Sequence, residues 1–146
     1  MFRETLRLLD ASPRRRVDRS SPALRSSSTV CTMPPEIHAS VVRLRPEAEA
    51  EYREIHTDVW PSVLAQIARS HIRDYSIHLR DGLLFARFTY VGDDYAADMA
   101  AMAADPETQR WWEMTNPMQE PLPTRAEGEW WAEMEPVFYF SGDAAG

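Results

Sequence analysis

The stretch YSIHLRDGLLFARFTYV, residues 75–91, decides the fold because it holds two strands and the turn between them. Apolar and polar residues alternate from Tyr75 to Leu79, a pattern typical of a strand with one buried face. Asp81-Gly82 is a pair that favours a tight hairpin turn. Leu83 to Val91 is then the second strand. The sequence therefore predicts an antiparallel hairpin in the middle of the chain.

The segment upstream of this hairpin predicts a strand followed by a broken helix. Loose alternation over residues 37–45 indicates a strand that ends at Pro46, and this proline opens a helix through Tyr52 and His56. Pro61 cannot donate a hydrogen bond inside a helix. We therefore expect a kink or a restart at residues 58–60, after which the helix continues to Ala68.

The segment downstream of the hairpin predicts a second broken helical unit and a last strand. An alanine-rich helix is expected over residues 94–104, and Asp105-Pro106 begins another that carries a tryptophan pair. Three prolines end this helix, and an irregular loop runs to about residue 128. The apolar run VFYF, residues 137–140, is expected to be the last strand.

The resulting order, β-α-β-β-α-β, is that of a ferredoxin-like α+β fold. In this fold four antiparallel strands carry helices on one face only. The other face needs a cover, and for a chain of 146 residues a second copy is the economical one. The sequence therefore predicts a homodimer.

Composition excludes several classes of function. The net charge of −7 makes nucleic acid and anionic membrane surfaces poor partners. All 16 basic residues are arginine, which excludes Schiff-base lysine chemistry and a phosphate-binding lysine. With Cys31 as the only cysteine there is no disulfide framework. No apolar run approaches the roughly 20 residues of a membrane span, and we predict a cytoplasmic protein.

Residues 1–32 differ in composition from the rest of the chain. They are rich in arginine and serine and poor in acidic residues, whereas residues 33–146 carry the negative charge. Three interpretations stay open: a disordered tail, a start codon placed too early with Met33 as the true start, or a transit peptide. In each case we expect residues 33–146 to form the folded domain.

His56 is the first candidate for chemistry, since an imidazole pKa of about 6.5 suits proton donation and acceptance at neutral pH. In EYREIHTDVWP, residues 51–61, Tyr52 lies one helical turn before His56 and Trp60 one turn after it. The ordinary alternative is a helix histidine that bonds a neighbour. A core stripe rarely places histidine between tyrosine and tryptophan, so we interpret this face as a cavity wall with His56 and Tyr52 as catalytic residues and Trp60 as a substrate contact.

Two tryptophan pairs are candidate binding residues. Trp111 and Trp112 diverge by about 100° on a helix, so one is expected to anchor the core and the other to line a pocket. An indole face packs well against the C–H face of a sugar ring. Trp130-Trp131 either caps the same site or holds the C-terminal strand in place.

His78 is a weaker candidate on the first strand of the hairpin. It faces the side opposite Tyr75, Ile77 and Leu79, and either lines the site from the sheet or makes a cross-strand polar pair. The sequence has no His-Glu-x-x-His motif, Asp-rich calcium loop or glycine-rich phosphate loop, so we expect neither a metal nor a cofactor. No Gly-x-Ser-x-Gly elbow supports a serine triad.

Five motifs in order resemble the L-rhamnose mutarotase family over about residues 40–140: residues 51–61, Tyr75-Ser76-Ile77, Leu84-Phe85-Ala86, Arg110-Trp111-Trp112 and Val137-Phe138-Tyr139. The resemblance implies a dimeric α+β barrel that interconverts the α and β anomers of a 6-deoxy sugar. It implies that His56 is the acid/base, that Tyr52 contacts the substrate, and that the tryptophan pair falls on Trp111 and Trp112.

The chain departs from the family pattern at three places. Ile55 stands where a basic residue usually precedes the histidine, residues 119–131 replace a Pro-Asp-Asn-Ser-Pro-like loop, and Pro136 replaces an acid before the last strand. The variant loop looks similar to a branch associated with L-fucose, so the sugar is either L-rhamnose or L-fucose. Because fold does not fix function, a cofactor-free monooxygenase or a non-catalytic sugar binder is the alternative.

Overall fold

The expected hairpin is present in the computed structural model, which describes residues 36–140 and residue 142. β2 (Ile72–Arg80) and β3 (Leu83–Tyr90) pair in antiparallel fashion. Between them, Asp81 and Gly82 have φ angles of +52° and +73°, the left-handed conformation that both central residues of a type I′ turn adopt. The predictions for residues 1–32 lie outside the described residues.

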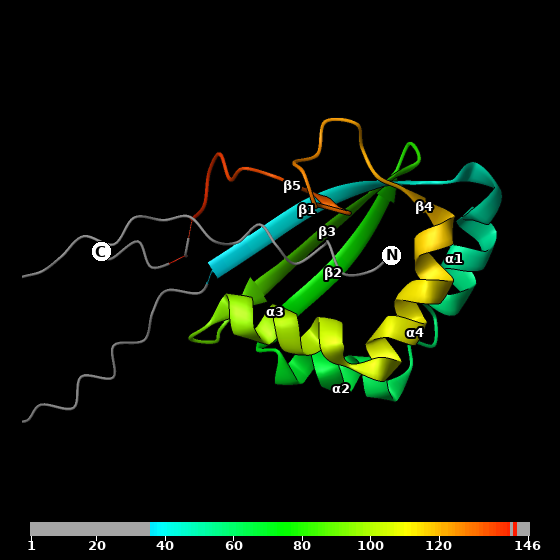
Figure 1. Cartoon of the computed structure of the whole chain (residues 1–146). Helices are drawn as coiled ribbons and strands as arrows, with labels where there is room; N and C mark the ends of the chain where they lie inside the picture. The colour runs from blue at the N-terminus through cyan, green and yellow to red at the C-terminus, as the bar shows by residue number, and fades with distance from the viewer. Residues whose placement is uncertain (1–35, 141, 143–146) are drawn as a thin grey trace, which may run out of the picture.

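β1 (Glu36–Leu44) is the expected first strand and lies beside β3 in the sheet. The strand order β2-β3-β1-β4 is antiparallel throughout, as the ferredoxin-like α+β pattern requires. Two short strands share the outer edge of β1: β4 (Gln119–Glu120) pairs near its end and β5 (Ala132–Glu133) pairs near its middle. The curled sheet and its covering helices confirm the predicted fold class (Figure 1).

The prediction of a last strand at residues 137–140 is wrong. The edge of β1 is taken by β5, and the amide of Met134 donates to the Ala39 carbonyl at 2.8 Å. Pro136 then has no N–H to continue the ladder, and the chain leaves the sheet beyond β5 (Figure 1). Val137 and Phe138 are consequently 98% and 85% exposed.

Proline breaks the first helical unit where expected. A single 3-10 turn, η1 (Pro46–Ala48), leads into α1 (Glu49–Ile55), and α2 (Pro61–Arg69) starts again at Pro61. His56 caps the end of α1 directly after Ile55, and the chain turns away before Trp60. The restart sets α2 in a new direction instead of extending α1 (Figure 1).

The second helical unit is also divided in two, and an aspartate begins each half. The Asp94 carboxylate accepts from the Ala97 amide at the start of α3 (Tyr95–Ala104). The Asp105 carboxylate accepts from the Thr108 amide at 2.8 Å at the start of α4 (Pro106–Thr115). These bonds satisfy N–H groups that a helix start leaves without a partner. The 3-10 turn η2 (Asn116–Met118) then connects α4 to β4.

The hydrophobic core lies between the sheet and the helices, which all run along one side of it (Figure 1). Val42, Leu44 and Leu84 are at most 1% exposed and point to the helix side. Tyr52 from α1 belongs to the same core cluster, so a predicted catalytic residue is anchored in the best-packed part of the molecule. Among the described residues, no helix is long and apolar enough to cross a membrane.

Candidate active site

The end of α1 places His56 between two aromatic rings. Its imidazole stacks on the Tyr52 ring with centroids 4.1 Å apart and meets the Trp111 indole edge-on at 5.4 Å. Tyr52 and Trp111 are 5% and 7% exposed, whereas His56 is half-buried. The imidazole is therefore held by well-packed neighbours while one side of it stays accessible.

One hydrogen bond assigns the proton of the neutral His56 ring. Nδ1 lies 2.7 Å from the backbone carbonyl oxygen of Tyr52. A carbonyl only accepts, so Nδ1 carries the proton and Nε2 carries the lone pair. Burial lowers the pKa of His56 below its ordinary value, although the Tyr52 carbonyl opposes this effect. At neutral pH the site thus presents a neutral imidazole with a basic Nε2.

Trp60 lies near His56 and Trp111, but not because it shares a helix face with His56 as the sequence predicted. The sequence placed Tyr52, His56 and Trp60 on one face of a single helix, but α1 ends at Ile55 and Trp60 precedes α2. The Trp60 ring instead packs edge-on against Trp111, with centroids 5.4 Å apart. The indole of α4 therefore joins the two halves of the broken helix.

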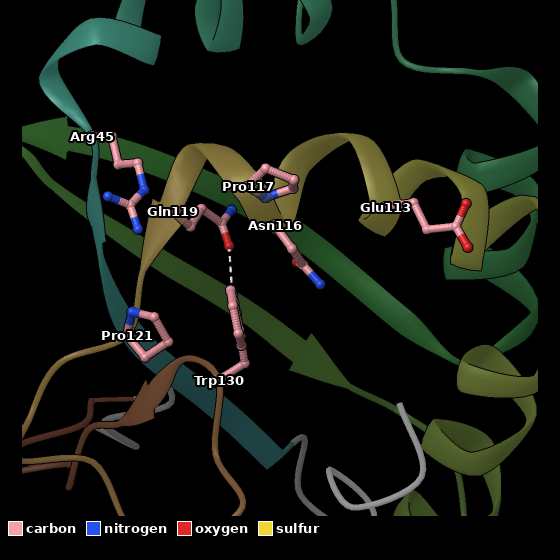
Figure 2. Close-up of a pocket in the computed structure, with 7 residues that line it drawn as sticks. All are labelled: Arg45, Glu113, Asn116, Pro117, Gln119, Pro121 and Trp130. Carbon is pink, nitrogen blue, oxygen red and sulfur yellow. Dashed lines mark hydrogen bonds between the residues drawn. The ribbon is translucent and has the colours of Figure 1, made fainter. Parts of the chain in front are cut away.

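Gln119 is a site residue that sequence reasoning missed. Its side chain is 4% exposed, and its Oε1 accepts from the Trp130 indole Nε1 at 2.8 Å (Figure 2). The Gln119 amide also lowers the pKa of the Tyr52 phenol, although burial and the nearby Tyr75 raise that pKa by more. No sequence motif identifies such a glutamine, because its position near Tyr52 depends on the pairing of β4 with β1.

A cavity of about 420 Å³ opens beside Gln119. Figure 2 shows side chains from the end of α4, from β4 and from the loop after it arranged around this space. Its size falls in the range of small-molecule sites. Polar amides and a carboxylate line it together with one indole, a mixture suited to hydroxyl groups and C–H faces. The lining residues are Arg45, Glu113, Asn116, Pro117, Gln119, Pro121 and Trp130.

The remaining sequence candidates lie in three different places. Trp112 is partly buried on α4 next to the buried Trp111. Of the second pair, Trp130 lines the cavity and Trp131 packs against the core. His78 lies on the sheet face away from the helices, exposed, with Nε2 3.2 Å from Ser76 Oγ. Within one chain, His78 and His56 are therefore on opposite sides of the sheet.

Comparison with known proteins finds similar sequences. The family model for L-rhamnose mutarotase matches residues 38–140. An L-rhamnose mutarotase from Rhizobium johnstonii is 35% identical over 95 residues, which cover 60% of this chain and 87% of that protein. One from Rhizobium etli is 35% identical over 98 residues, covering 62% and 90%.

A solved structure has a similar fold. The crystal structure of an L-rhamnose mutarotase from Formosa agariphila superposes with a TM-score of 0.57 and is 22% identical in sequence. The match covers 72% of this chain and 98% of that one. At this identity the likeness supports the α+β architecture.

Proposed function

The chain belongs to the L-rhamnose mutarotase family and is a sugar mutarotase, and we propose that His56 drives its α/β anomer exchange on a 6-deoxy sugar, L-rhamnose or L-fucose. The observation that carries this proposal is the neutral imidazole fixed between Tyr52 and Trp111. We propose that the sugar is bound by four aromatic residues near His56: Tyr52, Trp60, Trp111 and Trp112. The cytoplasmic location stays a prediction.

Anomer exchange requires little more than one positioned side chain that accepts and returns a proton. Nε2 of His56 takes the proton from the anomeric hydroxyl and returns it to the ring oxygen, which is bonded to the same carbon. The C1–ring oxygen bond breaks as the C1 carbonyl forms. After rotation about C1–C2 the reverse transfer closes the other anomer, so protons and electrons balance over the cycle.

The energetic demand is modest. Anomers exchange unaided in water within minutes to hours, and an ordinary turnover number requires a barrier lower by about 5–8 kcal/mol. General acid/base catalysis of about 10²–10⁴-fold together with orientation of the ring supplies that amount. This estimate supports a mechanism carried by side chains alone.

Anomer-exchange NMR tests the proposal. Micromolar protein is added to L-rhamnose, L-fucose and L-mannose, the last of which differs from L-rhamnose only by a hydroxyl at C6. We expect faster exchange of at least one 6-deoxy sugar, without added metal or cofactor. Unchanged exchange with both 6-deoxy sugars, or binding without exchange as a pure sugar binder would show, contradicts the proposal.

We also propose that the protein is a homodimer whose partner copy covers the open face of the sheet. Ile37, Ala39 and Phe85 occupy this face and, with Phe138, line a second cavity of about 330 Å³. The adjoining residues 137–140 are all apolar and 56–98% exposed. A contiguous apolar surface of this kind is uncommon on a monomer, and the same surface on a second copy is its natural complement.

Sedimentation of Phe138→Asp tests the dimer. The wild type is expected to have the mass of a dimer at micromolar concentration, whereas the variant is expected to be a folded monomer. Leu64→Asp is the matched control, because Leu64 is 52% exposed on α2 and far from the open face. A monomeric wild type would contradict the proposal.

A further inference from the structure

We propose that Gln119, held by the indole N–H of Trp130, is a positioning residue that orients the Tyr52 phenol toward the sugar. This inference rests on the proposed function, because it assigns a role within the same site. β4 pairs Gln119 with Leu44, so both side chains point to the helix side of the sheet. Tyr52 packs there with Leu44 and Met118, which brings the amide and the phenol together.

The chemistry of the indole determines the orientation of the amide. The Trp130 Nε1–H only donates, so the atom facing it at 2.8 Å must be the Gln119 oxygen. The amide nitrogen then faces away from the indole, on the side where Tyr52 packs with Leu44 and Met118, and the Gln119 amide lowers the pKa of the Tyr52 phenol. An amide nitrogen only donates, so in the proposed contact the phenol oxygen accepts. The phenolic proton is therefore left for a different acceptor.

The proposed bond from the Gln119 amide to the Tyr52 phenol oxygen leaves the phenolic O–H for the substrate. With its oxygen engaged by Gln119, the Tyr52 O–H is directed away from the core and serves as a donor to a sugar oxygen. His56 Nδ1 is bonded to the backbone carbonyl of the same tyrosine. One residue of α1 thus links the Gln119 amide to the imidazole, and the loop carrying Trp130 sets the donor geometry of the site. Gln119 and Trp130 both line the cavity of Figure 2.

A double-mutant cycle on the full chain tests this role by anomer-exchange NMR. Gln119→Leu removes the donor to Tyr52 and is expected to lower kcat/KM about tenfold in the wild-type background. In the Tyr52→Phe background, which has no hydroxyl to orient, the same change is expected to cost less than about twofold. Gln109→Leu is the control, an exposed glutamine on α4 that bonds only the Ala103 carbonyl among the described side-chain contacts.

Two further variants keep the test independent of folding. Trp130→Phe retains a ring but not the N–H, and we expect a loss of about threefold that also disappears with Tyr52→Phe. Gln119→Glu keeps the shape and the bond to Trp130, but at pH 8 its carboxylate accepts a hydrogen bond from the Tyr52 phenol, so this O–H is no longer free to donate to the sugar. A positioning role therefore predicts that the Glu variant is slower than the Leu variant, whereas a purely structural role predicts the reverse.

The outcomes separate this inference from the proposed function. An active wild type with equal losses in both backgrounds would overturn the positioning role and leave the mutarotase mechanism standing. A wild type that exchanges no sugar would overturn both. Losses confined to the background that contains the Tyr52 hydroxyl, with the Glu variant slower than the Leu variant, would support the assignment.

Discussion

His56 and His78 lie on opposite sides of the sheet, but only His56 is set up for proton transfer. His56, on the helix side, is stacked on Tyr52 and bonded through Nδ1 to a carbonyl. His78, on the open side, is exposed and contacts Ser76. A general acid/base needs a fixed tautomer and a limited supply of water. The packing around His56 fixes its tautomer and limits its contact with water. The exposed position of His78 on a strand does neither.

The largest expected effect compares buried and open aromatic residues. Trp111→Ala removes a side chain that is 7% exposed and contacts both His56 and Trp60, and should lower the free energy of unfolding by about 3–5 kcal/mol. Phe85→Ala on the open face should cost less, about 1 kcal/mol, in dilute protein. Chemical denaturation measures both, and similar losses for the two variants would show that the two faces are equally well packed.

Protein concentration sharpens this comparison. If the open face is covered by a second copy, the loss in Phe85→Ala grows as protein concentration rises, since the wild type gains stability from association. The loss in Trp111→Ala should be the same at every concentration. A concentration-independent melting temperature for the wild type would contradict the dimer instead.

The second prediction compares the replacement of each of the two histidines by asparagine. His56→Asn should slow anomer exchange by about 10²-fold or more, because asparagine keeps a hydrogen-bonding tip but cannot carry the proton. His78→Asn should change the rate by less than about twofold. Exchange measured by NMR at saturating sugar gives both numbers. A normal rate in His56→Asn would move the proton role elsewhere, with His78 the next residue to test.

The third prediction concerns the phenol. Tyr52→Phe keeps the ring that stacks on His56 and removes one hydroxyl, so exchange should fall by only about tenfold, with part of the loss in sugar binding. Tyr139→Phe is the matched control, since Tyr139 is 56% exposed beyond β5. Equal rates for wild type and Tyr52→Phe would show that the ring alone is needed.

The smallest effect is a shift of the pH profile. Burial lowers the pKa of His56 from its ordinary value of 6.5, so Nε2 stays basic at neutral pH and the exchange rate should fall as pH drops through a midpoint below 6.5. His78→Asn should leave the midpoint in place, and His56→Asn should remove the titration. A midpoint above 6.5 would contradict the lowered pKa.

The contribution of His56 to the stability of the fold also decreases at low pH. Because the His56 pKa is lower in the folded chain than in the unfolded chain, the unfolded chain binds more protons below pH 6.5. The contribution of this residue to the free energy of unfolding therefore decreases as pH falls below that value and is fully retained above it.

Local rules explain the parts of the molecule that were predicted correctly. Asp81-Gly82 determines the hairpin because both residues adopt positive φ readily. Pro61 determines the helix break because it has no N–H, and the four-residue spacing of Tyr52 and His56 determines their stacking within α1. Each of these depends on neighbours within one or two turns of chain, which the sequence shows directly.

Tertiary structure alone decided the rest. The residues at 137–140 have strong strand propensity, yet Ala132–Glu133 occupies the edge of β1, because two segments compete for the same N–H and C=O groups and only one can pair. Gln119 meets Tyr52 only after β4 pairs with β1, and Trp60 meets His56 only through Trp111. Contacts between distant segments depend on how whole elements pack, and no local pattern encodes them.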